Sequence, residues 1–318
     1  MIKIENLSKS FSKVKAVDNI SFEVKEQETL VLLGTSGCGK TTLLKMINRL
    51  IEPTSGNIFI NSQNILNRKP EELRRGIGYV LQNTGLFPHY TVAQNIAIVP
   101  QLLKSDKKKT ENRTRELLAK LHLDKKYLNA YPNELSGGQQ QRVGLARALV
   151  ADPPVLLMDE PFGALDTVTR SKIQAEFKAL DELKRKTIIM VTHDVQEAFE
   201  LGDRVCLMDK GKIVQLGSPA DLLFKPVNEF ASTFLKDQRL LLEFKAIKPP
   251  PHPEGGTFEL DGITLPSDAN VWFLLERLKY TNAEYISILD KEHSEIGKLG
   301  FNDLMSVFYQ HKKSYSHE

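Results

Sequence analysis

Residues 29–41 read Thr29-Leu30-Val31-Leu32-Leu33-Gly34-Thr35-Ser36-Gly37-Cys38-Gly39-Lys40-Thr41. The stretch opens with a short apolar run that ends at a glycine, the pattern of a strand buried on both faces. From Gly34 to Thr41 it fits G-x-x-x-x-G-K-[ST], and helix-like sequence follows from about Thr41 to Leu50. A glycine-rich loop between a buried strand and a helix presents backbone N–H groups to an anion at the helix N-terminus. The stretch therefore predicts a phosphate-binding loop.

The loop also carries side chains suited to a nucleotide and its metal ion. Lys40 is expected to neutralise the β- and γ-phosphates, and the Thr41 hydroxyl is expected to ligate Mg²⁺. Cys38 occupies a variable position of the pattern, so we expect it to be a small packing residue. The candidate nucleotide-binding residues of this region are Gly34, Ser36, Gly37, Cys38, Gly39, Lys40, Thr41 and Thr42.

A second apolar strand ends in two adjacent carboxylates, in the stretch Val155-Leu156-Leu157-Met158-Asp159-Glu160. Because consecutive strand residues point to opposite faces, Asp159 and Glu160 are expected to do different jobs. Asp159 suits Mg²⁺, and Glu160 suits the activation of an attacking water. Beside a phosphate-binding loop, the two carboxylates predict nucleotide hydrolysis.

Strands and helices alternate along much of the chain. Strand–loop–helix order recurs at 155–158 and 187–191, which favours an α/β fold with a mostly parallel sheet. Near the N-terminus, residues 2–4 and 20–24 alternate apolar and polar side chains, the pattern of half-buried strands. Residues 84–150 show helix patterns and no clear strand. They predict a helical subdomain inserted in the α/β core.

A further loop, Leu135-Ser136-Gly137-Gly138-Gln139, precedes a predicted helix from Gln140 to Val150. A hydroxyl and two glycines at a helix N-terminus form a second anion site, which has no lysine to bind a phosphate alone. This loop, the phosphate-binding loop and the acidic strand together resemble the nucleotide-binding domain of ABC transporters. The resemblance covers residues 1–242. It implies a P-loop NTPase fold with a mostly parallel sheet, an antiparallel β subdomain and a helical subdomain.

The resemblance assigns roles to further residues. It implies that Phe11 stacks on the adenine ring and that Asp166 belongs to the D-loop sequence Ala164-Leu165-Asp166. It implies that Gln82 is the Q-loop glutamine, a catalytic residue and a metal ligand together with Thr41 and Asp159. The remaining catalytic residues that it implies are Lys40, the general base Glu160 and the switch histidine His193, which holds the γ-phosphate and the water.

Members of this family work as head-to-tail dimers around two ATP molecules. The resemblance therefore implies that each ATP contacts two copies of the chain, and that Mg²⁺ accompanies it. One copy would contribute Lys40, Thr41, Gln82, Asp159, Glu160 and His193. The other copy would contribute its second loop, with Ser136 and Gly138 as the main contacts and Gly137 and Gln139 beside them.

Two segments narrow the resemblance, Met46-Ile47-Asn48-Arg49-Leu50-Ile51-Glu52-Pro53 and Asn83-Thr84-Gly85-Leu86-Phe87-Pro88-His89. Both look like the ATP-binding subunits of bacterial importers for glycine betaine, carnitine, choline and related quaternary amines. Residues 72–79 and 159–166 agree with this resemblance. It implies a peripheral subunit at the cytoplasmic face of the cell membrane, with permease subunits and an extracytoplasmic solute-binding protein as partners. A histidine-derived betaine or an amino acid is the alternative solute.

The same resemblance implies where the permease binds. Residues 82–90 would line a groove that receives a coupling helix of the permease. Leu86 and Phe87 are candidate apolar contacts in that groove, and packing inside the helical subdomain is the equal alternative for both side chains.

The composition changes after Leu242. Residues 243–256 include three consecutive prolines and end in two glycines, so they predict a linker. Residues 257–318 predict a small α+β module, because residues 271–278 carry apolar side chains at helical spacing and residues 285–289 read as a strand. The module resembles a single cystathionine-β-synthase (CBS) motif. This implies regulation by a nucleotide or by ionic strength, and a structural dimerisation tail is the alternative.

Composition limits the other classes of function. The chain has 318 residues, with 43 basic and 40 acidic side chains, so its charge gives no case for nucleic acid as the main partner. Its only cysteines, Cys38 and Cys206, exclude a disulfide framework and zinc-ligand spacing. The N-terminus lacks the apolar core of a signal peptide, and no apolar run approaches the roughly 18–20 residues of a membrane span. We therefore expect a soluble cytosolic chain.

The rival class is a soluble ABC-type ATPase that acts on nucleic acid or ribosomes. Such proteins usually carry coiled-coil or zinc insertions, or two ATPase domains in one chain. The sequence shows none of these features. The leading hypothesis is therefore an ATPase that powers a permease.

Overall fold

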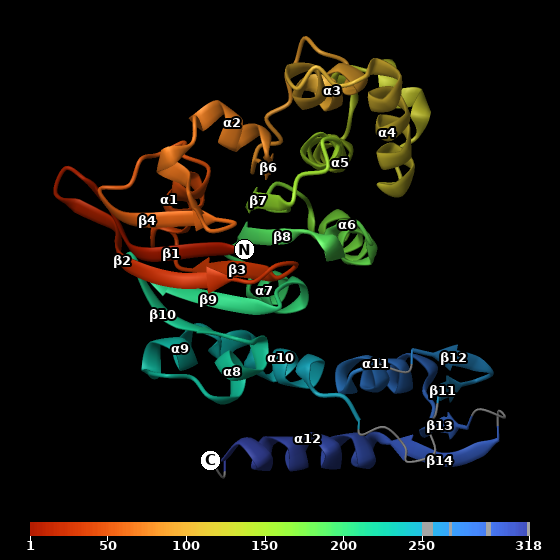
Figure 1. Cartoon of the computed structure of the whole chain (residues 1–318). Coiled ribbons are helices and arrows are strands. Elements are labelled where there is room, and N and C mark those ends of the chain that lie inside the picture. The colour runs from red at the N-terminus through yellow and green to blue at the C-terminus, as the bar shows by residue number, and fades with distance from the viewer. Residues whose placement is uncertain (250–256, 267–268, 291–293, 317–318) are drawn as a thin grey trace. The chain divides into compact units, whose positions relative to one another are not determined.

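The computed structural model describes residues 1–249, 257–266, 269–290 and 294–316. The chain forms two compact units, Met1–Ser218 and Pro219–Glu318 (Figure 1). The first unit contains two β-sheets, and the described residues of the second unit form one. The units divide between Ser218 and Pro219, whereas the sequence predicts a domain boundary after Leu242.

A six-stranded sheet forms the centre of the first unit, with the strand order β10-β9-β3-β8-β7-β6. Strands β9, β3, β8, β7 and β6 are parallel, and β10 runs antiparallel to β9. Every residue of β7 and β8 is buried, as the uninterrupted apolar runs predict. The strands are β3 (Thr29–Gly34), β6 (Ile77–Val80), β7 (Val155–Asp159), β8 (Thr187–Val191), β9 (Arg204–Asp209) and β10 (Lys212–Gly217). The predicted mostly parallel α/β sheet is thus confirmed.

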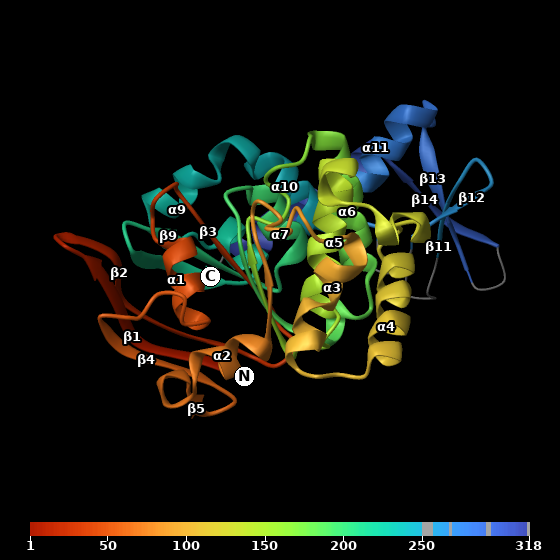
Figure 2. The same ribbon diagram turned by 90° about the horizontal axis from the view of Figure 1, so that it is seen from above.

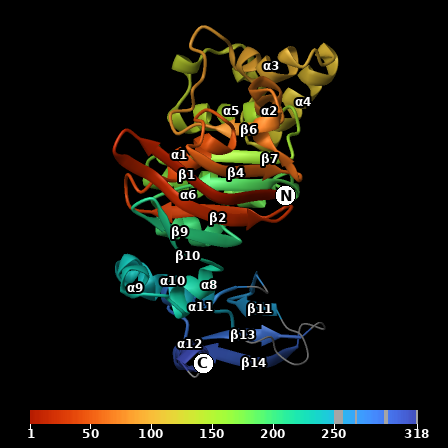
Figure 3. The same cartoon turned by 60° about the vertical axis from the view of Figure 1, so that its left-hand side comes forward.

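A second, antiparallel sheet forms the N-terminal β subdomain, with the strand order β2-β1-β4-β5. Strands β1, β2 and β4 lie side by side in Figure 3. Ile2 and Ile4 are each 1% exposed, while Lys3 between them is exposed, so the predicted alternation is confirmed. The strands are β1 (Ile2–Phe11), β2 (Val14–Val24), β4 (Ser55–Ile60) and β5 (Gln63–Asn64).

Seven α-helices belong to the described part of the first unit. They are α1 (Lys40–Ile47), α2 (Pro70–Arg75), α3 (Val92–Leu102), α4 (Lys107–Lys120), α5 (Gly137–Leu149), α6 (Thr167–Ala179) and α7 (Val195–Leu201). Helices α3, α4 and α5 pack together as a helical subdomain, apart from strands β1, β2 and β4 (Figure 2). Short 3-10 turns occur at Ile65–Asn67, Lys125–Asn129, Pro132–Glu134 and Leu183–Arg185. Nowhere in the described chain is a helix both long and apolar enough for a bilayer span.

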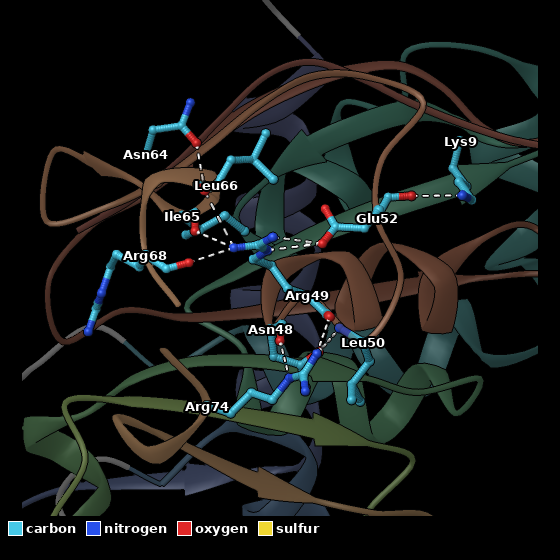
Figure 4. Close-up of polar contacts among 10 residues, drawn as sticks. All are labelled: Lys9, Asn48, Arg49, Leu50, Glu52, Asn64, Ile65, Leu66, Arg68 and Arg74. Atoms are coloured by element: carbon cyan, nitrogen blue, oxygen red, sulfur yellow. Dashed lines mark hydrogen bonds and ion pairs between the residues drawn. The ribbon is translucent and has the colours of Figure 1, made fainter. Parts of the chain in front are cut away.

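Two arginines tie the end of α1 to α2 (Figure 4). Arg49 follows α1, and its guanidinium donates to the Glu52 carboxylate and to three backbone carbonyls, those of Ile65, Leu66 and Arg68. Arg74 of α2 donates back to the carbonyls of Asn48 and Arg49. The segments 46–53 and 72–79, which carry the resemblance to importers, are therefore in direct contact. We call this arrangement the Arg49–Arg74 brace.

The second unit contains an antiparallel sheet in the order β12-β11-β13-β14 and helices around one core. Phe244 of α10 packs on Phe308 of α12, with ring centroids 4.4 Å apart. Because α10 shares this core, residues 243–246 are helical and do not belong to an extended linker. Residues 250–256 of the predicted linker lie outside the described residues. The elements are α8 (Pro219–Phe224), α9 (Glu229–Phe234), a 3-10 turn (Lys236–Gln238), α10 (Arg239–Ala246), β11 (Thr257–Leu260), β12 (Ile263–Leu265), α11 (Val271–Thr281), β13 (Tyr285–Leu289), β14 (Glu295–Gly300) and α12 (Phe301–Ser316).

Candidate functional site

The predicted phosphate-binding loop connects β3 to α1, and two of its glycines have no room for a side chain. A Cβ on Gly34 would lie 2.1 Å from the Met208 carbonyl oxygen, and one on Gly39 would lie 2.1 Å from the Ala16 carbonyl oxygen. Gly39 also has a φ of 107°, in the left-handed region that favours glycine. The loop therefore depends on glycine for its path, as a backbone cradle for phosphate does.

The loop encloses a pocket of about 200 Å³. The Lys40 ammonium lies across the loop and donates to the carbonyls of Gly34 (2.8 Å) and Thr35 (2.9 Å). The pocket is lined by Ala16, Ser36, Gly37, Cys38, Gly39, Lys40, Thr41, Thr42 and Glu160. The structure thus brings most of the predicted loop residues to one cavity, together with a carboxylate from a distant part of the sequence. Ala16 was missed from sequence because its contribution is made by its backbone.

Two oxygen donors beside the pocket suit a magnesium ion. The Thr41 hydroxyl donates a hydrogen bond of 2.8 Å to Oδ1 of Asp159. Burial raises the pKa of Asp159, and the hydrogen bond from Thr41 opposes this effect. Hydroxyl and carboxylate oxygens are the donors that Mg²⁺ takes, so these residues fit the predicted metal ion.

Glu160 is the meeting point of the predicted catalytic residues. Its Oε2 accepts a hydrogen bond from Nε2 of Gln82 (3.0 Å) and lies 3.1 Å from Nδ1 of His193. Its backbone has a φ of 44°, unusual for a residue with a side chain, and its N–H donates to the Val191 carbonyl. The end of β7 is therefore shaped to bring this carboxylate toward Gln82 and His193, beside the pocket.

The second glycine loop lies at the start of α5. The Ser136 side chain accepts from the Gln139 N–H and the Gln139 side chain accepts from the Ser136 N–H, which form a reciprocal cap. Helix α5 therefore begins at Gly137, so the predicted start at Gln140 is wrong. The helix starts early because the two glycines and Gln139 form its first turn under this cap.

The second loop lies against the start of α6, where Asp166 caps that helix. A Cβ on Gly138 would come within 2.9 Å of Cγ2 of Thr169, so the two helix starts are closely packed. Asp166 accepts from the Thr169 N–H at 3.0 Å, and hydrogen bonds from Thr169 lower the pKa of Asp166. Although residues 136–139 and 166 are all described, none of them lines the phosphate-loop pocket of the same chain.

Phe11 stands at the end of β1 with its ring available to a partner. The side chain is 47% exposed, and the Lys9 ammonium lies 5.0 Å from the centroid of its ring. Phe11 does not line the phosphate-loop pocket among the described residues. The stacking of Phe11 on adenine therefore remains a prediction.

Arg147 of α5 makes contacts that the sequence did not predict. Its guanidinium donates to the carbonyls of Thr84 (2.6 Å) and Gly85 (2.7 Å), in the loop that follows Gln82. Burial lowers the pKa of Arg147. Backbone carbonyls leave no mark in the sequence, so no pattern could have predicted these contacts. They join α5 to the loop behind Gln82.

A groove of about 300 Å³ opens beside this loop. Its lining residues include Arg74, Tyr79, Leu81, Phe87, Val99 and Arg147. Phe87 is 44% exposed and contributes to the groove, whereas Leu86 is half-buried and does not line it in the described chain. The groove is therefore a mixed apolar and basic surface.

Comparisons with known proteins agree with this geometry. The ABC transporter family model matches residues 17–163. The glycine betaine/carnitine/choline transport ATP-binding protein of Bacillus subtilis is 52% identical over 242 residues, which are 76% of this chain and 64% of that protein. This chain therefore covers somewhat less than two thirds of that relative.

Two further matches cover nearly all of the other protein. The glycine betaine uptake system ATP-binding protein of Escherichia coli is 42% identical over 96% of this chain and 99% of its own length. A dimeric ATP-binding cassette in a post-hydrolysis state, bound to ADP and Pi, superposes with a TM-score of 0.62 and 34% identity. That match covers 69% of this chain and 98% of the cassette. The chain belongs to the ABC transporter family, as one of its ATP-binding proteins.

Proposed function

We propose that this chain hydrolyses ATP and thereby powers a bacterial importer for a quaternary amine of the betaine type. The observation that carries the hydrolytic part is the convergence of Gln82 and His193 on Glu160, beside the phosphate-loop pocket. A general base that is held by two side chains next to a phosphate site is the arrangement that water attack requires.

In the proposed reaction the phosphate-binding loop and Lys40 hold the β- and γ-phosphates. Thr41, Asp159 and Gln82 would hold Mg²⁺, which neutralises charge on the phosphate oxygens when it is bound. Water attacks the γ-phosphorus, and the bond to the β–γ bridging oxygen breaks. Glu160 takes the proton of the water, and His193 holds the γ-phosphate and the water in place. The products are ADP and phosphate.

The proposed catalytic unit is a homodimer. The second loop, residues 136–139, does not line the pocket of its own chain. A second anion site at a helix start suits the γ-phosphate that a partner chain binds. Asp166 packs beside this loop and would face the same partner. A dimer explains why one chain carries two separate phosphate-binding loops.

The groove beside the Gln82 loop is the proposed docking site for a permease. It combines apolar side chains such as Leu81 and Phe87 with the guanidinium groups of Arg74 and Arg147. An amphipathic segment of a membrane protein would find both kinds of contact there. The chain would then work as a peripheral subunit at the cytoplasmic face of the cell membrane, with a solute-binding protein on the other side.

The proposal of a quaternary amine as the solute rests on the names of the relatives alone. The relatives from Bacillus subtilis and Escherichia coli are both named for glycine betaine. The deciding experiment reconstitutes this chain with the permease and the solute-binding protein encoded beside it. ATP hydrolysis is measured against glycine betaine, carnitine, choline, proline betaine, a thiol-bearing histidine betaine and an ordinary amino acid. Stimulation by one quaternary amine supports the proposal, and hydrolysis without any such response rules out the solute.

The second unit is the proposed regulatory module. From Ile263 to Ser316 its described elements follow the order β12, α11, β13, β14, α12, which suits the CBS-like motif. We infer that it pairs with its copy in the other subunit and responds to a nucleotide or to ionic strength. Mixing full-length and tail-deleted subunits tests this, because dimers with one tail should then lose regulation. Unchanged regulation in the mixed dimers would contradict pairing of the two modules and would favour a purely structural role for the tail.

A further inference from the structure

A buried carboxyl group, that of Glu197, lies in the first turn of α7, which follows His193 in the chain. Glu197 is 4% exposed, and its Oε2 accepts a hydrogen bond of 2.9 Å from the Thr192 hydroxyl. Its Oε1 is buried as well and accepts no hydrogen bond from any residue that the structure describes. Burying a carboxyl group with an unsatisfied oxygen costs stability, so the position needs a reason.

The Thr192 hydroxyl connects this carboxyl group to the turn that carries His193. It donates to Glu197 and accepts from the Asp194 N–H at 3.0 Å. The Thr192 N–H donates to the carbonyl of Leu32 in β3, and Thr192 itself is 2% exposed. The residues on both sides of His193 are thus fixed by one buried hydroxyl. The His193 side chain itself is 60% exposed, so few side-chain contacts hold it and its backbone position matters for the contact with Glu160.

Arg170 links the same turn to the Asp166 loop. Its Nη1 lies 3.5 Å from Oδ2 of Asp194, and its Nη2 donates to the Leu165 carbonyl at 3.0 Å. Asp194 also caps α7 by accepting from the N–H groups of Gln196 and Glu197. The turn around His193 is therefore held from β3, from α6 and from α7 at once.

We propose that Glu197, acting through the Thr192 hydroxyl, is a positioning residue that holds His193 against Glu160. This inference rests on the proposed ATP hydrolysis. The competing explanation is that Glu197 merely stabilises the start of α7, as an acidic residue in a first turn does. Because the Thr192 hydroxyl also accepts from the Asp194 N–H, only a change at Glu197 itself separates the two explanations. Glu197→Leu removes the acceptor of the Thr192 hydroxyl. It should lower kcat if Glu197 positions His193, and should lower only the stability if Glu197 merely stabilises the start of α7.

The test compares steady-state ATP hydrolysis of the full chain for Glu197→Leu, Thr192→Val, Thr192→Ser, His193→Ala and the double variant of Thr192→Val with His193→Ala. Valine has the shape of threonine without the hydroxyl, so we expect kcat to fall about 10- to 100-fold with KM for ATP unchanged. Serine keeps the hydroxyl and should restore kcat. Because Thr192 acts through His193, Thr192→Val should cost less than about twofold once His193 is alanine. An equal loss in both backgrounds would overturn the inference.

Two further measurements separate positioning from misfolding. Thr114→Val is the matched control, because Thr114 is a buried threonine (3% exposed) on α4 and should leave kcat unchanged. The ring resonances of His193 in an NMR spectrum should shift on Glu160→Gln in the wild type and stop responding in Thr192→Val. A response that persists in Thr192→Val contradicts the inference. A wild-type chain that hydrolyses no ATP refutes the proposed function instead.

Discussion

Nδ1 of His193 lies 3.1 Å from Oε2 of Glu160, a contact that becomes a hydrogen bond when Nδ1 carries the proton. The two residues are far apart in the sequence but follow neighbouring parallel strands, since Asp159 of β7 is paired with Val191 of β8. The carboxyl ends of parallel strands meet at one edge of a sheet, and this edge also receives Gln82 from the end of β6. The sheet topology therefore assembles the three side chains.

Replacement of Glu160 by glutamine should abolish most of the hydrolysis and leave ATP binding in place. Glutamine keeps the shape of the side chain but cannot take a proton, so we expect kcat to fall about 10²- to 10⁴-fold. Phosphate release and binding of a fluorescent ATP analogue measure the two effects separately. Glu111→Gln, an exposed position on α4, is the control and should behave like the wild type. Normal turnover in Glu160→Gln would exclude Glu160 as the base.

Asp159→Asn should change the dependence of hydrolysis on magnesium. The amide keeps an oxygen near the Thr41 hydroxyl but loses the negative charge that attracts the ion. The concentration of free Mg²⁺ that gives half-maximal hydrolysis should rise about 10- to 100-fold. Asp181→Asn, whose side chain is 87% exposed, is the control. An unchanged magnesium profile would remove Asp159 from the metal site.

Arg49→Ala should destabilise the first unit without touching the pocket. The change leaves the carbonyls of Ile65, Leu66 and Arg68 without their charged donor and breaks the pair with Glu52. We expect the free energy of unfolding to fall by about 2–4 kcal/mol, measured by chemical denaturation. The exposed Arg75 of α2 provides the control, and Arg75→Ala should stay within about 0.5 kcal/mol. Equal effects of the two variants would contradict the structural role of the brace.

Glu197 should make the protein less stable as the pH rises through the neutral range. Burial raises the pKa of Glu197 to about 7 from an ordinary value of 4.5. The folded state therefore holds the proton more tightly than the unfolded state, and this advantage is lost as the pH rises from 4.5 toward 7. The full effect is about 3 kcal/mol.

Glutamine at this position has no proton to lose. Between pH 5 and pH 8 the free energy of unfolding of the wild type should therefore fall relative to that of Glu197→Gln. Urea denaturation at several pH values measures the difference, with Glu111→Gln as a surface control. Parallel stability curves would show that Glu197 does not titrate differently in the folded state.

The local patterns of the sequence were enough for the central fold and for much of the pocket. Residues 30–33 and 155–158 are uninterrupted apolar runs, and both lie in buried strands of the parallel sheet. The glycine pattern at 34–41 predicted a loop in which tight backbone contacts now explain why Gly34 and Gly39 are glycines. Such features are local, because strand burial and loop geometry are encoded within a few neighbouring residues.

Contacts to the backbone and between distant segments could not be read in the same way. Arg147 and Arg49 act on carbonyls, which every residue possesses, so their partners leave no signature. The packing of α10 into the second unit was not predicted either, because an apolar helix face does not specify which core it covers. The early start of α5 depends on a reciprocal cap, whereas the sequence pattern at the same residues predicts only an anion site.

Helix α5 joins two places that are otherwise remote from each other. Ser136 caps its first turn, and Arg147, near its last turn, grips the loop behind Gln82. An α-helix of this length is a stiff rod of about 20 Å. We therefore expect a displacement of the loop to move Ser136 with it, because the helix between them bends little. A substitution that makes the middle of α5 more flexible would therefore uncouple Ser136 from the loop while leaving the contacts at both ends intact.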